Sequence, residues 1–226
     1  MRVVRPKPDI RSKSGEIPHP VLSSTKFEPA SVPPFAASRV PLRSVPKPVI
    51  RARMSDVSVR MAENPGDFEV AQRLCREWLD WHWRHYPSDW PRGADNPMDP
   101  MKFEAIVQKL PTLHERPGGG IIIWSVDGQA VGCVMYREAE KEAGLAEFNR
   151  MFVSEGGRGH GLGRLMLEYM FEQLRADGYC MMHFSSANRL THAAMYEAAG
   201  FSDIPHPTGF PDEWRKRAYV MERTLI

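Results

Sequence analysis

The 226-residue sequence contains no apolar run near the ~18 residues that a membrane-spanning helix needs, so we expect no membrane partner. Cysteine is also scarce. Cys75, Cys133 and Cys180 are far apart in the chain, and this spacing excludes a disulfide framework and a zinc ribbon. Isolated cysteines suit a reducing compartment, which predicts a cytoplasmic protein without a bound metal.

Two common phosphate-binding motifs are missing. No Gly-Lys pair occurs in the chain, which excludes a Walker loop. The dinucleotide motif G-x-G-x-x-G fails as well, because the sixth position counted from Gly157 is Leu162 and the sixth counted from Gly159 is Arg164. Any phosphate site in this chain therefore has another form.

Acidic residues are scarce in residues 1–55, which contain 3 of them and 11 lysines and arginines. The same segment contains 10 of the 20 prolines. This proline density is incompatible with regular helices and interior strands. We therefore expect a disordered basic tail over 1–55 and a folded domain over 56–226. The tail could bind an acidic partner, serve as a targeting signal, or have no role if translation starts at Met54. Nucleic acid is not the partner we expect.

From residue 57 onward, segments with the period of strands alternate with segments that have the period of helices. Asp127-Gly128 predicts a tight hairpin between two of the strands. The pattern indicates an α/β fold, in which an antiparallel hairpin region joins a βαβ unit in one mixed sheet with helices on both faces. The expected strands are 57–61, 121–126, 129–136, 146–153, 179–185 and 217–224, and the expected helices are 66–86, 100–110, 161–176 and 191–199.

A glycine-rich loop joins the strand over 146–153 to the helix that follows it. Gly159, Gly161 and Gly163 leave backbone N–H groups uncovered at the start of that helix, where partial positive charge collects. Arg158 and Arg164 add full charges that suit phosphate oxygens. The loop therefore predicts a pyrophosphate site.

Residues 158–163, Arg-Gly-His-Gly-Leu-Gly, have the form Arg/Gln-x-x-Gly-x-Gly/Ala and resemble the loop of the GNAT family of acyl-CoA-dependent N-acyltransferases. Residues 132–134 look like the family's third strand, residues 146–153 like its fourth, and residues 196–201 like its Y-x-x-x-G-F segment. Together these segments span most of 57–226 in the expected order. The resemblance implies a mostly antiparallel GNAT sheet that is splayed at its centre.

The resemblance also implies acetyl-CoA as co-substrate, with its pantetheine arm in the splay and its pyrophosphate on the loop amides. Asn188 lies one residue before the position of an asparagine that the family often uses. The implied donor-binding residues are Met151, Phe152, Val153, Arg158, Gly159, His160, Gly161, Leu162, Gly163, Arg164 and Asn188.

Two residues match catalytic positions of the family. Tyr196 matches the general acid that protonates the leaving thiolate, and Glu147 matches a common position of the base. Each could instead be structural, Tyr196 as a buried ring packed on Phe201 and Glu147 as a buried carboxylate. His183 is an alternative base because an ordinary histidine titrates near neutral pH, although its apolar strand favours a core position.

These features predict an enzyme, an N-acetyltransferase that moves an acetyl group from acetyl-CoA directly to the primary amine of a small molecule. A protein lysine or N-terminal acetyltransferase and a non-catalytic CoA-binding module are the alternatives. A homodimer is possible. We expect the acceptor to bind between residues 65–116 and 202–216, where aromatic side chains could hold a cationic amine. These are Trp78, Trp81, Trp83, Tyr86 and Trp90.

Overall fold

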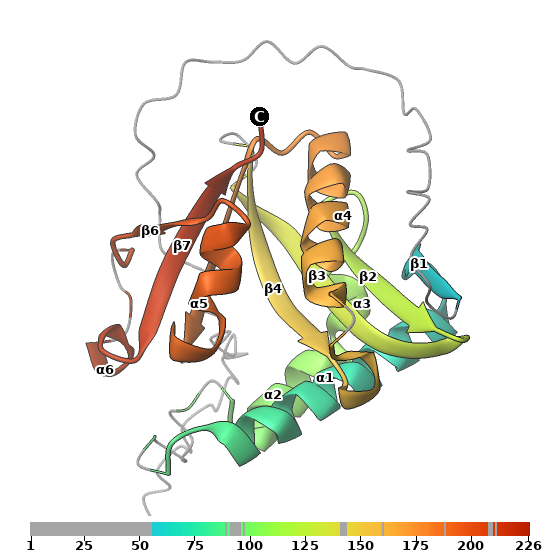
Figure 1. Ribbon diagram of the computed structural model, residues 1–226, viewed down its shortest axis with the longest axis horizontal. Helices are drawn as coiled ribbons and strands as arrows, with labels where there is room; N and C mark the ends of the chain where they lie inside the picture. Colours follow the sequence, from blue (N-terminus) through green and yellow to red (C-terminus); the bar gives the residue numbers. More distant parts are fainter. Residues whose placement is uncertain are drawn as a thin grey trace, which may run out of the picture.

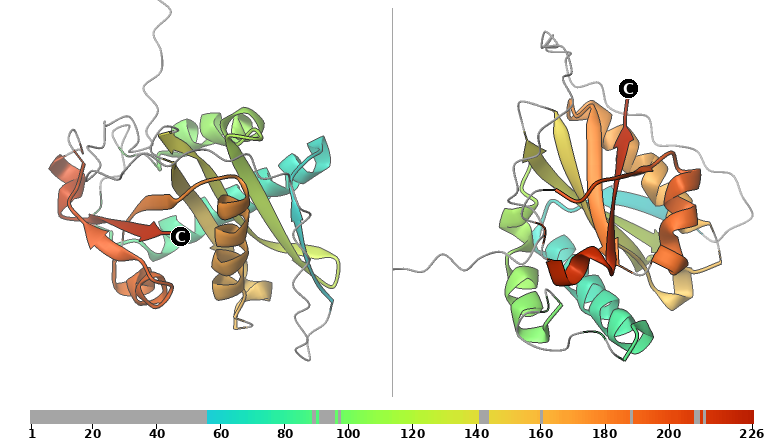
Figure 2. Two further views of the ribbon diagram at one scale, coloured as in Figure 1. Left: turned by 90° about the horizontal axis from the view of Figure 1, so that it is seen from above. Right: turned by 90° about the vertical axis from the view of Figure 1, so that its left-hand side faces the viewer.

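The computed structural model describes residues 56–226 except 89, 91–95, 97, 141–143, 160, 188, 208–209 and 211. The tail predicted for residues 1–55 lies outside the described residues. The fold is a seven-stranded sheet in the order β1-β2-β3-β4-β5-β7-β6. Figure 2 shows β1 at one end of this sheet and β6 and β7 at the other.

Four strands form the first part of the sheet, and each pairs with its sequence neighbour in antiparallel fashion. They are β1 (Val57–Met61), β2 (Gly119–Val126), β3 (Gln129–Glu140) and β4 (Leu145–Val153). Between β2 and β3, Asp127 and Gly128 have φ angles of 50° and 76°. Positive φ at both central residues is what the predicted tight hairpin requires.

Three strands form the second part of the sheet: β5 (Met181–Ala187), β7 (Ala218–Thr224) and the short β6 (Ser202–Ile204). β7 lies between the other two and is antiparallel to both. The loop expected over 202–216 in fact contains β6 and the four-residue helix α6 (Asp212–Arg215). Elements this short carry no periodic signal, which is why the sequence pattern missed them.

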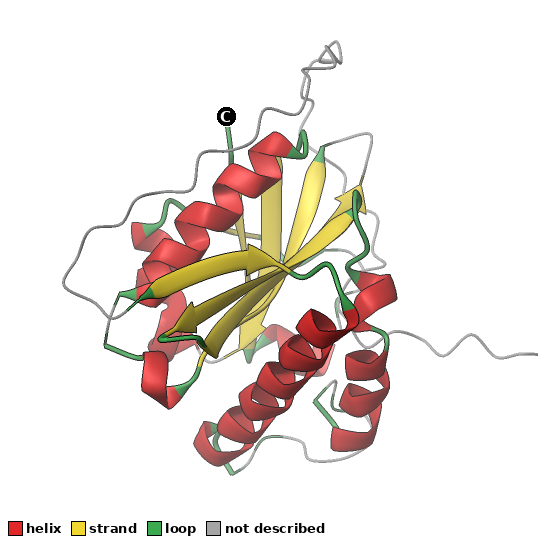
Figure 3. Ribbon diagram, turned by 90° about the vertical axis from the view of Figure 1, so that its right-hand side faces the viewer, coloured by secondary structure: helices red, strands yellow, loops and turns green. Residues whose placement is uncertain are grey.

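Helices cover both faces of the sheet (Figure 3). On one face lie α1 (Pro65–His85), α2 (Pro100–Gln108) and α3 (Leu110–Leu113), and on the other lie α4 (Leu162–Ala176) and α5 (Arg189–Ala198). The helix expected over 100–110 therefore ends at Gln108 and is followed by a separate turn of helix. The predicted mixed α/β fold is confirmed.

Successive residues of the central strands enter opposite cores, as the period of a strand requires. Ile121 and Ile123 of β2 pack with α1–α3, whereas Ile122 and Trp124 pack with α4. All four are at most 1% exposed. Because both faces are buried, β2 is a continuous apolar run rather than an alternating one. Among the described residues, no helix is both long enough and apolar enough to cross a bilayer.

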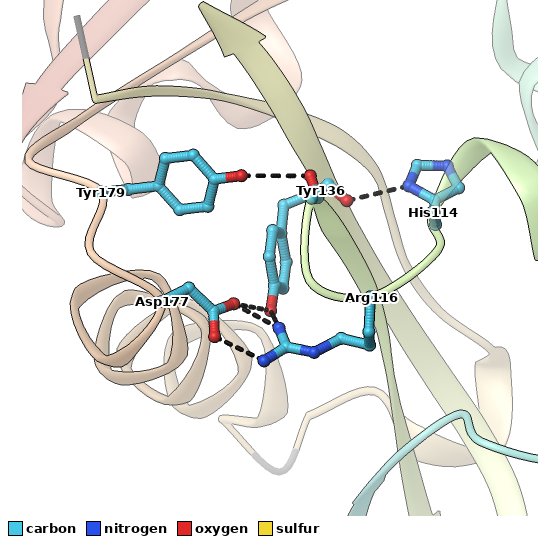
Figure 4. Close-up of polar contacts among 6 residues, drawn as sticks. His114, Arg116, Tyr136, Asp177 and Tyr179 are labelled. Atoms are coloured by element: carbon cyan, nitrogen blue, oxygen red, sulfur yellow. Dashed lines mark hydrogen bonds and ion pairs between the residues drawn. The ribbon is translucent and has the colours of Figure 1, made fainter. Parts of the chain in front are cut away.

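A polar network joins the end of α4 to β3 and to the loop after α3 (Figure 4). Asp177 accepts hydrogen bonds from the Tyr136 hydroxyl at 2.6 Å and from Arg116 Nη2 at 2.5 Å. The Tyr179 hydroxyl donates to the carbonyl oxygen of Gly118 at 3.1 Å. Burial lowers the pKa of His114 to about 3, and its Nδ1 lies 2.9 Å from the Tyr136 carbonyl oxygen. The neutral ring therefore donates to that oxygen.

We predict that Asp177→Asn lowers the free energy of unfolding by about 1–3 kcal/mol, because the Tyr136 hydroxyl and Arg116 lose a charged acceptor. Urea denaturation measures this change. Glu77→Gln is the control, since it removes the exposed i,i+4 ion pair with Arg73 and should cost less than about 0.5 kcal/mol. Equal losses in the two variants would contradict a structural role for the network.

Candidate functional site

The sheet opens between β4 and β5. These strands are parallel and pair only at Leu145 with Met181, Ala146 with Met182 and Glu147 with His183. Beyond these positions β4 continues along β3, and β5 continues along β7. Figure 1 shows the two parts of the sheet diverging from their common end, with α1 crossing below the opening. The facing edges of both strands therefore lack a neighbouring strand within the described chain.

A bulge in β4 accompanies this divergence. Met135 of β3 pairs with Asn149, whereas Cys133 pairs with Phe152, so β4 has one more residue than β3 over this stretch. Arg150 and Met151 thus lie opposite the single residue Val134, and Arg150 has a φ of 42°. Bulges bend the strand that contains them, and the bend in β4 directs its second half away from β5.

A pocket of about 480 Å³ occupies the region of the opening. Most of its lining is apolar or aromatic and comes from α1, β4, β5, α5 and α6. The lining residues are Trp78, Trp81, His82, Tyr86, Met98, Phe148, Arg150, Met151, Phe152, Val153, Arg158, Gly163, Phe184, Ser185, Ser186, Ala187, Met195, Tyr196, Trp214 and Ala218.

The aromatic face of α1, formed by Trp78, Trp81, His82 and the C-cap residue Tyr86, lines one side of the pocket. These residues share a face because they recur at the spacing of helical turns. His82 Nδ1 lies 2.7 Å from the carbonyl oxygen of Trp78, which fixes the ring against the helix. Trp214 of α6 lines the pocket from the C-terminal part of the chain. The structure thus joins the two segments from which the sequence predicted the acceptor site.

The predicted phosphate loop follows β4 as η1 (Glu155–Gly157) and residues 158–161. Gly157 is required for packing, because a Cβ atom there would lie 2.9 Å from Val153 Cγ1. Gly159 and Gly161 have φ angles of 79° and 71°, which few residues other than glycine adopt. No described side chain caps the first turn of α4, so its N–H groups are available to an anion.

The two loop arginines have different surroundings. Arg158 Nε donates to the Val153 carbonyl oxygen at 3.1 Å, and the guanidinium lies 5.1 Å from the centre of the Trp81 ring. This arginine thereby connects the loop to the aromatic face of α1. Arg164 is largely exposed and pairs with Glu168 at 2.7 Å. It can turn toward a bound phosphate at little cost, because an exposed ion pair is weak.

Tyr196 lines the pocket from α5 and is only 7% exposed. Its ring packs 4.5 Å from that of Phe184 and 5.8 Å from that of Phe201. Burial raises the pKa of its hydroxyl well above the ordinary value, so the group carries its proton at neutral pH. None of the described residues forms a hydrogen bond with that hydroxyl, which leaves it able to donate to a ligand.

Glu147 and His183 face each other at the last paired position of β4 and β5. Glu147 is 5% exposed and accepts a hydrogen bond from Arg137 Nε at 2.7 Å. Burial lowers the pKa of His183, which keeps its ring neutral at pH 7. Neither residue is among those that line the pocket. Both lie where the opening begins.

Residues 75–201, more than half of the chain, match the family model described as the acetyltransferase (GNAT) family. This chain belongs to the GNAT family. The search of curated proteins found no significant match to this sequence.

Solved structures of GNAT proteins share this fold. The chain resembles a GNAT acetyltransferase from Staphylococcus aureus Mu50 with a TM-score of 0.58 and 15% identity, over 76% of this chain and 100% of the other. For an acetyltransferase from Streptococcus agalactiae 2603 the TM-score is 0.57 and the identity 16%, over 74% of this chain and 98% of the other. The PaiA N-acetyltransferase from Thermoplasma acidophilum was solved in complex with coenzyme A. Its TM-score is 0.52 and its identity 14%, over 75% of this chain and 99% of the other. At these identities the likeness shows the GNAT fold alone.

The structure brings together part of the site expected from the GNAT resemblance. Met151, Phe152, Val153, Arg158, Gly163 and Tyr196 line the pocket. Gly159, Gly161, Leu162 and Arg164 form the adjoining loop and first turn of α4, and the Leu162 side chain is buried in the core. His160 and Asn188 lie outside the described residues.

Several pocket residues were missed by the sequence analysis. Arg150, Phe184 and Trp214 line the pocket but were not among the predicted site residues. Arg150 did leave a signal, since it is the one basic residue of the segment 146–153. Phe184 and Trp214 left none, because an aromatic residue in a core and one in a pocket look alike in sequence. Two aromatic residues expected there, Trp83 and Trp90, are not part of the lining.

We predict that Gly161→Ala lowers the free energy of unfolding by about 1–2 kcal/mol, because an L-residue at a φ of 71° is strained although its Cβ meets open space. Gly156→Ala is the matched control. Its Cβ also meets open space, and its φ is not positive. Chemical denaturation of both variants measures the difference, and equal stability would show that the loop does not need its left-handed turn.

Proposed function

We propose that this GNAT protein is an enzyme that transfers an acetyl group from acetyl-CoA to the primary amine of a small molecule. The observation that carries the proposal is the opening between β4 and β5 beside the uncapped start of α4. An extended thioester arm fits between the two strand edges, and a diphosphate fits at the backbone N–H groups of the helix start.

The donor would bind along β4 and the loop. The amide groups of a pantetheine arm can pair with the free backbone edge near Met151 and Val153, much as an added strand would. Phosphates would bind the N–H groups from Gly159 to Arg164. The CoA complex of the PaiA enzyme, which has the same fold, supports this donor. No cluster of three or more metal-ligating side chains occurs in the described part of the chain.

The size of the pocket favours a small acceptor over a protein side chain. Its volume of about 480 Å³ falls in the range of small-molecule sites. Trp214 and the aromatic face of α1 supply large apolar surfaces to its lining. A lysine on a folded protein would need an open groove, whereas a free amine can enter as a whole molecule.

The reaction requires two proton movements. The amine nitrogen forms a bond to the thioester carbonyl carbon, the carbon–sulfur bond then breaks, the nitrogen loses a proton and the sulfur gains one. We assign delivery of the proton on sulfur to Tyr196, which burial keeps protonated. A thiol pKa near ~8.5 makes the thiolate a poorer leaving group than the neutral thiol.

We retain Glu147 as the proposed base, acting through water, because it lies where β4 and β5 separate. His183, the residue paired with it, is the alternative base. Direct transfer is favoured over a covalent enzyme intermediate, since none of the three cysteines lines the pocket. All three are free thiols, which supports a cytoplasmic location.

A screen of primary amines for thiol release from acetyl-CoA tests the proposed function. Amino acids, polyamines, arylalkylamines and lysine peptides cover the acceptor classes. We expect turnover with at least one small amine and loss of turnover in the Arg158→Glu, Gly161→Glu double variant. Turnover with peptides alone would favour the protein acetyltransferase. Donor binding without turnover of any amine would favour the non-catalytic module.

We predict that Tyr196→Phe lowers kcat by about 10²-fold, the lower end of the range for general acid catalysis, with little change in KM for acetyl-CoA. Steady-state thiol release measures both constants. Tyr219→Phe is the matched control, because Tyr219 is a buried tyrosine 6.2 Å from the same Phe184 ring but outside the pocket lining. Unchanged kcat in Tyr196→Phe would exclude this residue as the acid.

A further inference from the structure

Arg150 is a charged residue in a largely apolar pocket. It lies at the β4 bulge and lines the cavity beside the aromatic face of α1. Its guanidinium carbon is 5.5 Å from the centre of the Phe103 ring on α2. This contact places the side chain on the face of the sheet that carries α1 and α2, which is opposite to the face covered by α4.

The guanidinium of Arg150 has no hydrogen bond or ion pair with any residue in the described ranges. The carboxylate that influences it most is Glu147, and Glu147 is already bonded to Arg137 at 2.7 Å. Burial lowers the pKa of Arg150, yet an arginine remains charged at neutral pH. A partly desolvated cation without an anion is costly, and a ligand carboxylate would relieve that cost.

The backbone of Arg150 is strained as well. A φ of 42° is uncommon for any residue other than glycine, and strain of this kind tends to occur at binding and catalytic sites. Glycine would relieve the strain at this position but would remove the side chain. The strained bulge directs a cation into the pocket beside Phe103.

We infer that Arg150 binds a carboxylate of the acceptor, so that the acceptor class is a small amine that also carries a carboxylate and an apolar or aromatic body. The inference rests on the proposed function of this pocket and narrows its substrate class. Planar guanidinium and carboxylate groups form paired hydrogen bonds, and the aromatic face of α1 supplies apolar contact to the rest of the molecule.

A binding experiment tests the carboxylate site without any acetyl transfer. The probes are 3-phenylpropionate and its uncharged amide, 3-phenylpropionamide, titrated into the full chain with and without coenzyme A. Fluorescence of the pocket tryptophans reports binding. We expect the carboxylate to bind at least about tenfold more tightly than the amide, as one charge-assisted pair implies. Equal affinities, or no binding of the carboxylate at ~10 mM, would overturn the inference.

Two variants of Arg150 test whether this residue causes the preference for the carboxylate over the amide. Arg150→Gln should reduce the preference for the carboxylate to within about twofold, whereas Arg150→Lys should keep part of it because the charge remains. Arg73→Gln is the control, since this half-exposed arginine of α1 lies outside the pocket lining. If Arg150→Gln weakens coenzyme A and leaves the preference intact, the arginine serves the donor and the inference is wrong.

A turnover experiment separates this inference from the proposed function. Phenylalanine and phenethylamine differ by one carboxylate, and we expect kcat/KM with acetyl-CoA to be at least about tenfold higher for phenylalanine. Equal turnover of the two amines with no probe preference would overturn the inference and leave the acetyltransferase intact. A clear probe preference without turnover of any amine would uphold the carboxylate site and overturn the proposed function.

Discussion

Strands β4 and β5 pair over only three residues, and the site depends on this limit. If the pairing continued, the two strand edges would satisfy each other and no ligand could enter between them. The bulge at Arg150 and Met151 bends β4 away, while β7 keeps β5 in the other part of the sheet. The opening therefore follows from one extra residue in β4 and from the pairing of β5 with β7.

The end of the sheet where β4 and β5 do pair, its closed end, is held together by polar contacts and close packing. Asp177, Tyr136 and Arg116 join α4, β3 and the loop after α3 through short charge-assisted hydrogen bonds. Close packing continues at Gly120, where a Cβ atom would lie 2.7 Å from Cζ of Tyr136. A firm closed end allows the other end to remain open, because the free edges of β4 and β5 do not have to hold the sheet together.

Much of the fold could be predicted from sequence, because local patterns determine it. Alternation in 57–61, the Asp127-Gly128 turn and the broad apolar face of α4 each follow from a few neighbouring residues. The positions of β6, α6 and Trp214 could not be predicted, since they depend on packing between distant segments. The site divides in the same way: the glycine loop is visible in sequence, whereas the partnerless state of Arg150 exists only once α2, β3 and β4 are assembled.

The central claim is that the opening and the adjoining loop bind acetyl-CoA. Calorimetric titration of the purified chain with acetyl-CoA tests it most directly. The account predicts saturable binding of one molecule per chain, and loss of that binding when Arg158 and Gly161 are both replaced by glutamate. Absence of any binding heat to the unaltered chain at millimolar acetyl-CoA would contradict it.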